Sequence, residues 1–222
     1  MISLAGEVLL DLLSPAVCAR LAEPALRKAY RGGELIHSRG DMQAGMGIVI
    51  RGRVKLCRIH PNGTQTFVSM VRQGQHFGDV LLFGKRRRRT HDALAEGAVL
   101  IDHYDAAAFE RVLDIPEVIK ALYRVTAQRL TGAMAMNDDL RSLPREVHLA
   151  KILLVLWRQG GERNSLTCIQ EDLAALLGTS PVTLSKCLVT LKREGLIETG
   201  YRQVRILDPE LLRGWLKAQT GG

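Results

Sequence analysis

Apolar and polar residues alternate in short runs between about Arg27 and Tyr104, and glycines interrupt these runs at short intervals. An apolar residue at every second position is typical of half-buried strands, and many short strands separated by turns indicate a sandwich or barrel-like β unit. The run 47–57 is interpreted as two strand-like pieces around a glycine turn. Pro61-Asn62-Gly63 predicts a hairpin, because Asn-Gly adopts positive φ at little cost.

Helical spacing replaces this alternation on both sides of the β unit. A short amphipathic segment at about 7–21 includes a helix start at Ser14-Pro15. After the β unit, a long helical pattern runs from about Ala106 to Ser142 and is weakly broken at Ile115-Pro116.

The long helical pattern contains a coiled-coil spacing. Nine residues recur at alternating four- and three-residue steps, and seven of them are apolar: Ile115, Ile119, Leu122, Thr126, Arg129, Ala133, Met136, Leu140 and Leu143. This spacing predicts a seam between two copies of the helix. The alternative is a helix that packs on its own β unit. Arg129 lies in the middle of the seam and needs a polar partner.

The chain after the hinge at Leu143-Pro144 has the pattern of a winged helix-turn-helix. A helix at 145–159 is followed by a short helix at 169–177 and the glycine turn at Gly178. Thr179 or Ser180 caps a second helix, which begins at Pro181 and reaches about residue 194. A strand pair with Arg202 in its turn then forms a basic β-wing. This order of elements is typical of a unit that places its second helix in a major groove; the alternative is an αα-hairpin without a nucleic-acid role.

Composition adds little to this picture. The 222 residues are 46% hydrophobic and 24% charged, as in an ordinary globular chain. The net charge of +8 favours an anionic partner. Residues 141–222 nevertheless hold 12 Lys and Arg against 8 Asp and Glu, so the motif and not the charge supports DNA binding.

The cysteines and the apolar runs indicate where the protein works. The four cysteines, at 18, 57, 168 and 187, are too widely spaced for a metal site or a disulfide framework. No signal peptide or membrane-length apolar run is visible. A cytoplasmic protein with no membrane partner and no metal is therefore expected.

The whole chain resembles the catabolite-activator and fumarate-nitrate regulator (CRP/FNR) family. Residues 178–186 are similar to that family's Gly-x-Ser-Arg-Glu-Thr-Val-x-Arg motif. The resemblance implies an α+β fold with a cyclic-nucleotide-binding-type β-roll (1–105), a long dimerisation helix (106–143) and a winged helix-turn-helix (144–222). It also implies a homodimer on two-fold symmetric, double-stranded DNA. Contact with RNA polymerase, and activation as against repression, stay open.

The resemblance implies DNA contacts residue by residue, and we expect them at Thr179, Ser180, Val182, Thr183, Lys186 and Arg202. Ser180 and Thr183 match phosphate-contacting positions of the family. Pro181 and Val182 replace its usual base-reading Arg and Glu, and Lys186 replaces its second Arg. The hypothesis is therefore a different target sequence, with Lys186 as chief base reader and Val182 against a thymine methyl.

A second resemblance concerns the family's phosphate-binding cassette, which is similar to residues 77–90. It implies ligand-binding roles for Gly78, Asp79, Arg89 and Thr90. In cyclic-nucleotide binders the acid takes the ribose hydroxyl and the arginine pairs with the cyclic phosphate. Asp79 is one methylene shorter than the usual Glu, and the family's adenine-contacting Thr-Ser pair aligns with Ala133-Met134. The effector is therefore expected to differ from cyclic AMP, or to be absent.

Several alternatives stay open on the sequence. Another anionic ligand or a nucleotide would suit the cassette, and the arginines at 86–89 belong either to an anion site or to a solvated loop. A regulator that needs a bound cyclic nucleotide is the main rival. A cupin-like enzyme is a further rival, but no catalytic residues are identified, because the strands lack a His-x-His pair.

Overall fold

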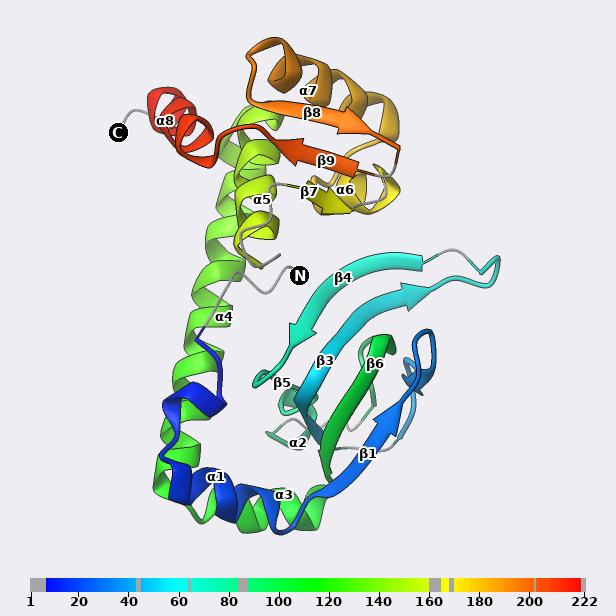
Figure 1. The fold of residues 1–222 in the computed structure, drawn as a ribbon, viewed down its shortest axis with the longest axis vertical. Helices are drawn as coiled ribbons and strands as arrows, with labels where there is room; N and C mark the ends of the chain where they lie inside the picture. Colours follow the sequence, from blue (N-terminus) through cyan, green and yellow to red (C-terminus); the bar gives the residue numbers. More distant parts are fainter. Residues whose placement is uncertain are drawn as a thin grey trace. The chain divides into compact units, whose positions relative to one another are not determined.

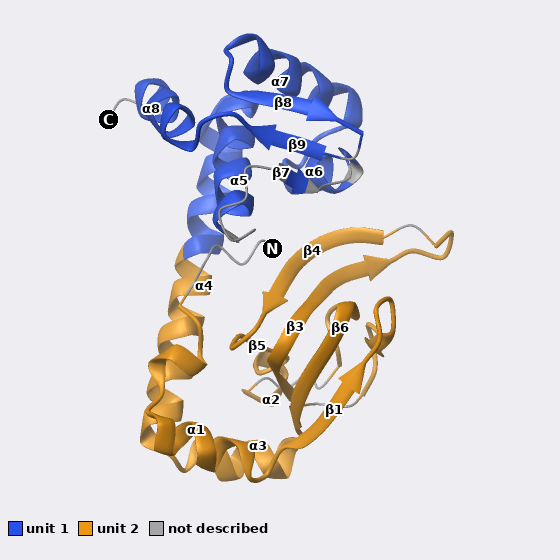
Figure 2. Ribbon diagram, viewed as in Figure 1, with its two compact units in different colours: residues 1, 3–5, 132–222 blue, residues 2, 6–131 orange. Residues whose placement is uncertain are grey.

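The computed structural model describes residues 7–42, 45–63, 65–83, 88–159, 165–167, 170–201 and 203–220. The chain forms two compact units, coloured separately in Figure 2, and the boundary between Thr131 and Gly132 falls within one helix. The α+β fold class, with a β-roll before a long helix and a winged helix-turn-helix, is confirmed.

The first unit is built on one antiparallel sheet that rolls up on itself (Figure 1). Its strands follow the order β1-β6-β3-β4, while β2 pairs with β6 and β5 with β3. The bounds are β1 Leu26–Tyr30, β2 Leu35–His37, β3 Met46–Ile59, β4 Gln65–Arg72, β5 His76–Phe77 and β6 Asp92–Tyr104. A short helix, α2 (Val80–Phe83), follows β5. The hairpin predicted at Pro61-Asn62-Gly63 is confirmed, with Gly63 at φ +79° between β3 and β4.

The prediction of two strand-like pieces around a glycine turn in 47–57 is wrong. β3 is one continuous strand, and Gly52 lies within it at φ +85°. The register of β3 against β6 shifts between Val49 and Arg53, on either side of this glycine. A bulge uses the same positive φ as a turn, so the glycine bends the strand without ending it.

Helices close one end of the β-roll. The helical segments η1 (Leu10–Leu12), α1 (Pro15–Ala22), α3 (Ala106–Leu113) and the first half of α4 (Pro116–Ser142) share one apolar core. That core includes Leu21, Phe109 and Val118, each almost fully buried. A second core, inside the roll, contains Val49, Val54 and Ile101. The weak break expected near Ile115-Pro116 is a real one, because α3 ends at Leu113 and α4 begins at Pro116.

Part of the predicted seam on α4 faces the protomer's own unit and not a second copy of the helix. Ile115 and Leu122 are buried in the helical core, and Arg129 bonds to residues of the β-roll. Four exposed apolar residues of α4 lie on another stripe: Ile119, Tyr123, Leu130 and Met134. The sequence-based seam therefore mixes residues of both faces.

The second unit contains the C-terminal helices and a three-stranded sheet of order β7-β9-β8. Its elements are α5 (Arg145–Gln159), β7 (Ser165–Thr167), α6 (Gln170–Leu176), α7 (Pro181–Arg193), β8 (Ile197–Gly200), β9 (Gln203–Ile206) and α8 (Pro209–Thr220). α8 was not predicted. In the described part of the chain, no helix is long and apolar enough to span a membrane.

Candidate nucleic-acid interface and sensor site

The turn between α6 and α7 is fixed by backbone geometry. Gly178 has φ +63°, which favours glycine. The Gly178 N–H donates to Ala175 O at 3.2 Å, and the Thr179 N–H donates to Ala174 O at 2.9 Å. These two bonds form a Schellman motif, which ends α6 and turns the chain into α7.

The start of α7 has the predicted cap. Ser180, not Thr179, is the N-cap residue, because its Oγ accepts the Thr183 N–H at 3.3 Å. Pro181 occupies the first turn, where its missing N–H costs no helix bond. The Ser180 and Thr183 hydroxyls also lie 3.1 Å apart. Both side chains therefore stand at the N-terminus of α7, where a helix favours anions.

The two faces of α7 are clearly separated. Leu184, Leu188 and Leu191 are buried against the second unit. On the outer face, Val182 is 69% exposed and Val189 is 53% exposed, and Lys186 is exposed between them. Residues four and three apart share a helix face. Sequence reasoning missed Val189, although it lies seven residues after Val182 and hence on the same stripe.

The wing is a β8–β9 hairpin, in which Thr199 pairs with Val204. Arg202, the predicted wing contact, lies outside the described residues. Arg205 on β9 pairs with Glu198 on β8 at 3.0 Å, so its charge is partly neutralised within the wing.

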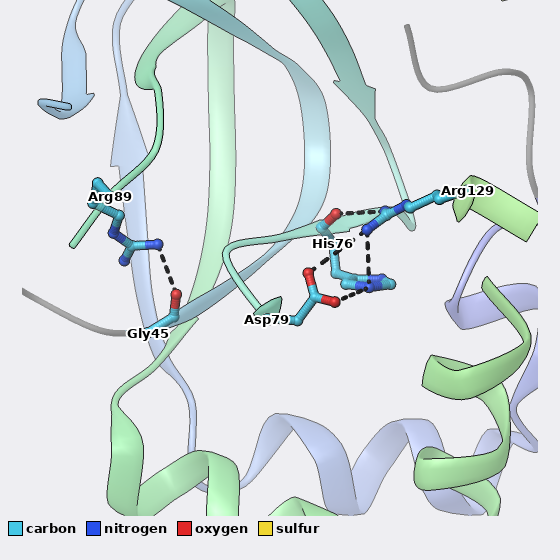
Figure 3. A network of polar contacts seen from close by, with 5 residues as sticks. All are labelled: Gly45, His76, Asp79, Arg89 and Arg129. Carbon is cyan, nitrogen blue, oxygen red and sulfur yellow. Dashed lines mark hydrogen bonds and ion pairs between the residues drawn. The ribbon is translucent and has the colours of Figure 1, made fainter. Parts of the chain in front are cut away.

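The predicted sensor residues fall into two separate groups, which Figure 3 shows side by side. In the first group, Arg89 Nη1 donates to the Gly45 carbonyl at 2.7 Å. Gly78 has φ +84°, and a Cβ there would collide with Arg89 and with the Gly45 carbonyl. Only glycine therefore lets the backbone pass so close to this guanidinium. Thr90 is exposed, and its hydroxyl lies 2.9 Å from His91 Nδ1.

Arg89 itself is only partly satisfied. Its Nε is buried and has no hydrogen-bond partner in the described part of the chain. Burial lowers the pKa of Arg89, and Asp41 opposes this shift. Among the described residues this desolvated guanidinium donates to one carbonyl, that of Gly45, which leaves donors for an added anion.

In the second group, Asp79 is 3% exposed and faces His76 and Arg129 (Figure 3). Its carboxylate lies 3.3 Å from His76 Nε2 and 3.6 Å from Arg129 Nη1. Arg129 Nη2 also donates to the His76 carbonyl at 2.8 Å. Arg129 thus has the polar partner that its place in the helix required, and it links α4 to the β-roll.

Burial determines the charges in this network. Burial lowers the pKa of the enclosed His76, so its ring is neutral at pH 7. Burial alone would raise the pKa of Asp79, but His76 and Arg129 outweigh it, and the pKa is lowered. Asp79 is therefore an anion that internal groups already hold. Asp79 and Arg89 do not form an ion pair with each other in the described part of the chain.

Comparison with known proteins identifies the domain families of the two units. Residues 27–115 match the family model described as a cyclic nucleotide-binding domain, and residues 147–215 match the one described as a Crp-like helix-turn-helix domain. The "Cyclic AMP receptor protein" of Thermus thermophilus is 29% identical over 187 residues, which cover 84% of this chain and 86% of the relative. The "CRP-like cAMP-activated global transcriptional regulator" of Mycobacterium tuberculosis is 26% identical over 212 residues, covering 90% and 92%.

A solved structure agrees with these matches. The crystal structure of the Thermus thermophilus catabolite activator protein is 26% identical, covers 97% of this chain and 99% of its own, and gives a TM-score of 0.54. A cyclic-nucleotide-binding-type β-roll joined to a winged helix-turn-helix defines a class of DNA-binding transcription regulators. The chain belongs to the CRP/FNR family of that class.

Proposed function

We propose that the protein is a homodimeric regulator that reads a two-fold symmetric DNA site with α7. The observation that supports this proposal most strongly is the outer face of α7, on which Val182, Lys186 and Val189 are exposed. Ser180 and Thr183 at the helix N-terminus bind phosphates, with Thr179 beside them. Arg202 of the wing adds a further contact.

Base reading on this face rests on two kinds of side chain. Lys186 donates to guanine O6 or N7, and each such contact discriminates by about 1–3 kcal/mol. Val182 contacts a thymine methyl. Pro181 offers no hydrogen-bonding group where the family usually has Arg, so the preferred half-site differs from the usual one.

The dimer forms through α4. Its apolar stripe includes Ile119, Tyr123, Leu130 and Met134, which are 49%, 76%, 62% and 61% exposed. Apolar residues repeated at helical spacing along one exposed face are the pattern of a helix that pairs with a second copy. We propose this stripe as the dimer contact in place of the seam predicted from the sequence, because Leu122 and Arg129 of that seam pack against the protomer's own first unit.

The effector site centres on Arg89, with Gly78 and Thr90 beside it. The ligand is an anion other than cyclic AMP, or the regulator works without one. Two features support this departure: Asp79 is already held by His76 and Arg129, and Ala133-Met134 lacks hydrogen-bonding side chains for a base. The protein is not an enzyme in this account, and it acts in the cytoplasm.

The test is a selection of duplexes from a random DNA pool by the purified protein without added ligand. We expect enrichment of a symmetric motif with half-sites about one helical turn apart. The Lys186→Ala variant should lose the preference at one position of each half-site. An unchanged base preference in this variant would refute the role of Lys186, and no enrichment at all would refute DNA binding by the ligand-free form.

A further inference from the structure

The first turn of α5 meets the start of the recognition helix at a polar contact. Arg145, the first residue of α5, donates from Nη1 to Thr179 Oγ1 at 3.0 Å. Thr179 directly precedes Ser180, the N-cap of α7. Two helix N-termini and three polar side chains therefore gather at one place in the second unit.

The Arg145 side chain has unused capacity at this place. A guanidinium carries five N–H donors, and the contact with Thr179 uses one of them. Arg145 is exposed and forms no ion pair with a carboxylate among the residues that the structure describes. The bond to a neutral hydroxyl holds the side chain in place and leaves its full positive charge available.

A phosphate is the group that best suits this arrangement. Guanidinium groups bind phosphate through two parallel N–H bonds, and helix N-termini direct further N–H groups at anions. Helix N-termini are among the groups that contact phosphate oxygens in protein–DNA interfaces. Arg145 is held at that N-terminus by Thr179, although it belongs to a different helix.

We propose that Arg145, Thr179 and Ser180 form a phosphate clamp that grips one backbone phosphate at the edge of each DNA half-site. Arg145 supplies the charge, Thr179 holds the guanidinium in position, and the Ser180 hydroxyl contacts the same phosphate. The clamp rests on the proposed function, because it needs α7 in a major groove. It extends the interface from the recognition helix to α5.

The clamp makes no base contact, so its loss should change the affinity for all DNA sequences and the salt dependence of binding. A phosphate contact adds to binding on every sequence and carries no sequence information. Each phosphate contact also contributes about 0.9 to the slope of log K against log salt concentration. If the Arg145–Thr179 bond were purely structural, its removal would change neither the salt slope nor the affinity for non-specific DNA.

The experiment measures binding by fluorescence anisotropy between about 50 and 300 mM salt, on the duplex selected by the wild-type protein and on a scrambled duplex. Arg145→Ala should reduce the slope by about 2 for the two half-sites and weaken both complexes roughly tenfold at low salt. The ratio of the two affinities should stay within about twofold of the wild-type ratio. Arg145→Lys, which keeps the charge, should recover most of the slope.

Two further variants separate the clamp from a general effect of charge. Arg158→Ala removes an exposed arginine from the last turn of the same helix and should leave the slope unchanged. Thr179→Val removes the hydroxyl that holds Arg145, so it should weaken binding while the slope stays close to that of the wild type. Thr179→Ser should restore the affinity.

The outcomes distinguish the clamp from the proposed function. A wild-type slope in Arg145→Ala, or an equal loss in Arg158→Ala, would overturn the clamp while DNA binding by α7 stands. Failure of the wild-type protein to prefer its selected duplex over the scrambled one would overturn the proposed function and the clamp together. Arg145 is exposed, so its variants should fold, and tryptophan fluorescence checks this.

Discussion

Arg129→Ala tests the link between α4 and the β-roll most sharply. The substitution removes the bond from Nη2 to the His76 carbonyl at 2.8 Å, the contact of Nη1 with His76 Nε2 at 3.3 Å, and the ion pair with Asp79 at 3.6 Å. Asp79 is then left as a buried carboxylate beside a neutral histidine. We therefore expect the first unit, and not the second, to lose stability.

The magnitude follows mainly from the lost hydrogen bond to the His76 carbonyl and the lost ion pair with Asp79. A hydrogen bond from a charged group contributes about 1.5–3 kcal/mol, and removing one partner of a buried ion pair costs about 3–5 kcal/mol. The Arg129 side chain is 26% exposed and its ion pair is long, so water compensates part of this loss. The expected destabilisation is about 2–4 kcal/mol.

The two tryptophans allow this loss to be located. Trp157 on α5 and Trp215 on α8 both belong to the second unit, so their fluorescence reports on that unit alone. Amide hydrogen exchange of β3 and β6 reports on the first unit. We expect exchange in these strands to accelerate roughly 30- to 1000-fold in Arg129→Ala, with the tryptophan unfolding midpoint unchanged.

Arg124→Ala is the matched control. Arg124 lies five residues earlier on α4, is 59% exposed, and pairs with Glu7 at the surface. Surface pairs contribute about 0–1 kcal/mol, so exchange should change less than about fivefold. Equal effects of the two substitutions, or an Arg129→Ala effect confined to the tryptophan transition, would refute the network as the tie between α4 and the β-roll.

Three further predictions follow from other features. Leu130→Glu should convert a dimer into a monomer in sedimentation velocity, whereas Ala135→Glu, exposed off the apolar stripe, should leave it dimeric; a dimeric Leu130→Glu would contradict the α4 interface. The pKa of His37 is lowered to about 4 by burial and by Arg89, so the folded state binds fewer protons than the unfolded state below pH 6.5. The contribution of His37 to stability should therefore be full above that pH and be lost by up to about 1.4 kcal/mol per pH unit between about pH 6.5 and 4; urea unfolding should show a profile that is less steep in His37→Gln by this amount, and an unchanged slope in the variant would refute it. Gly178→Ala places a Cβ at φ +63° and should destabilise the second unit by about 1–2 kcal/mol in tryptophan fluorescence, while Gly214→Ala on α8, where a Cβ meets nothing within 4 Å, should not.

The sequence predicted those parts of the fold that depend on local patterns. The alternation in 27–104 indicated the β-roll, and Gly178 with the following polar cap located the helix-turn-helix, because turn and cap chemistry is encoded within a few residues. The same local signals are present for α8 (Pro209–Thr220), although the helix was not predicted. Asp208 directly precedes this helix, and its Oδ1 accepts the Glu210 N–H at 2.8 Å.

Long-range pairing was beyond local patterns. The helix α4 carries apolar residues on two faces, and a repeat of 3.5 residues does not tell which face packs on the protomer's own unit. The partner of Arg129 was unpredictable for the same reason, since His76 lies 53 residues away and its burial depends on the rolled sheet. Gly52 was misread because a turn and a bulge need the same φ.

The central claim is that two copies of α7 read two half-sites in successive major grooves. The most direct test compares the affinity for the selected duplex with that for a duplex carrying five extra base pairs, about half a helical turn, between the half-sites. The account predicts that the dimer can then bind only one half-site of the lengthened duplex. It should lose about half of the 4–10 kcal/mol of free energy that separates specific from non-specific binding, which lowers the affinity roughly 30- to 5000-fold. Equal affinity for both duplexes would contradict it.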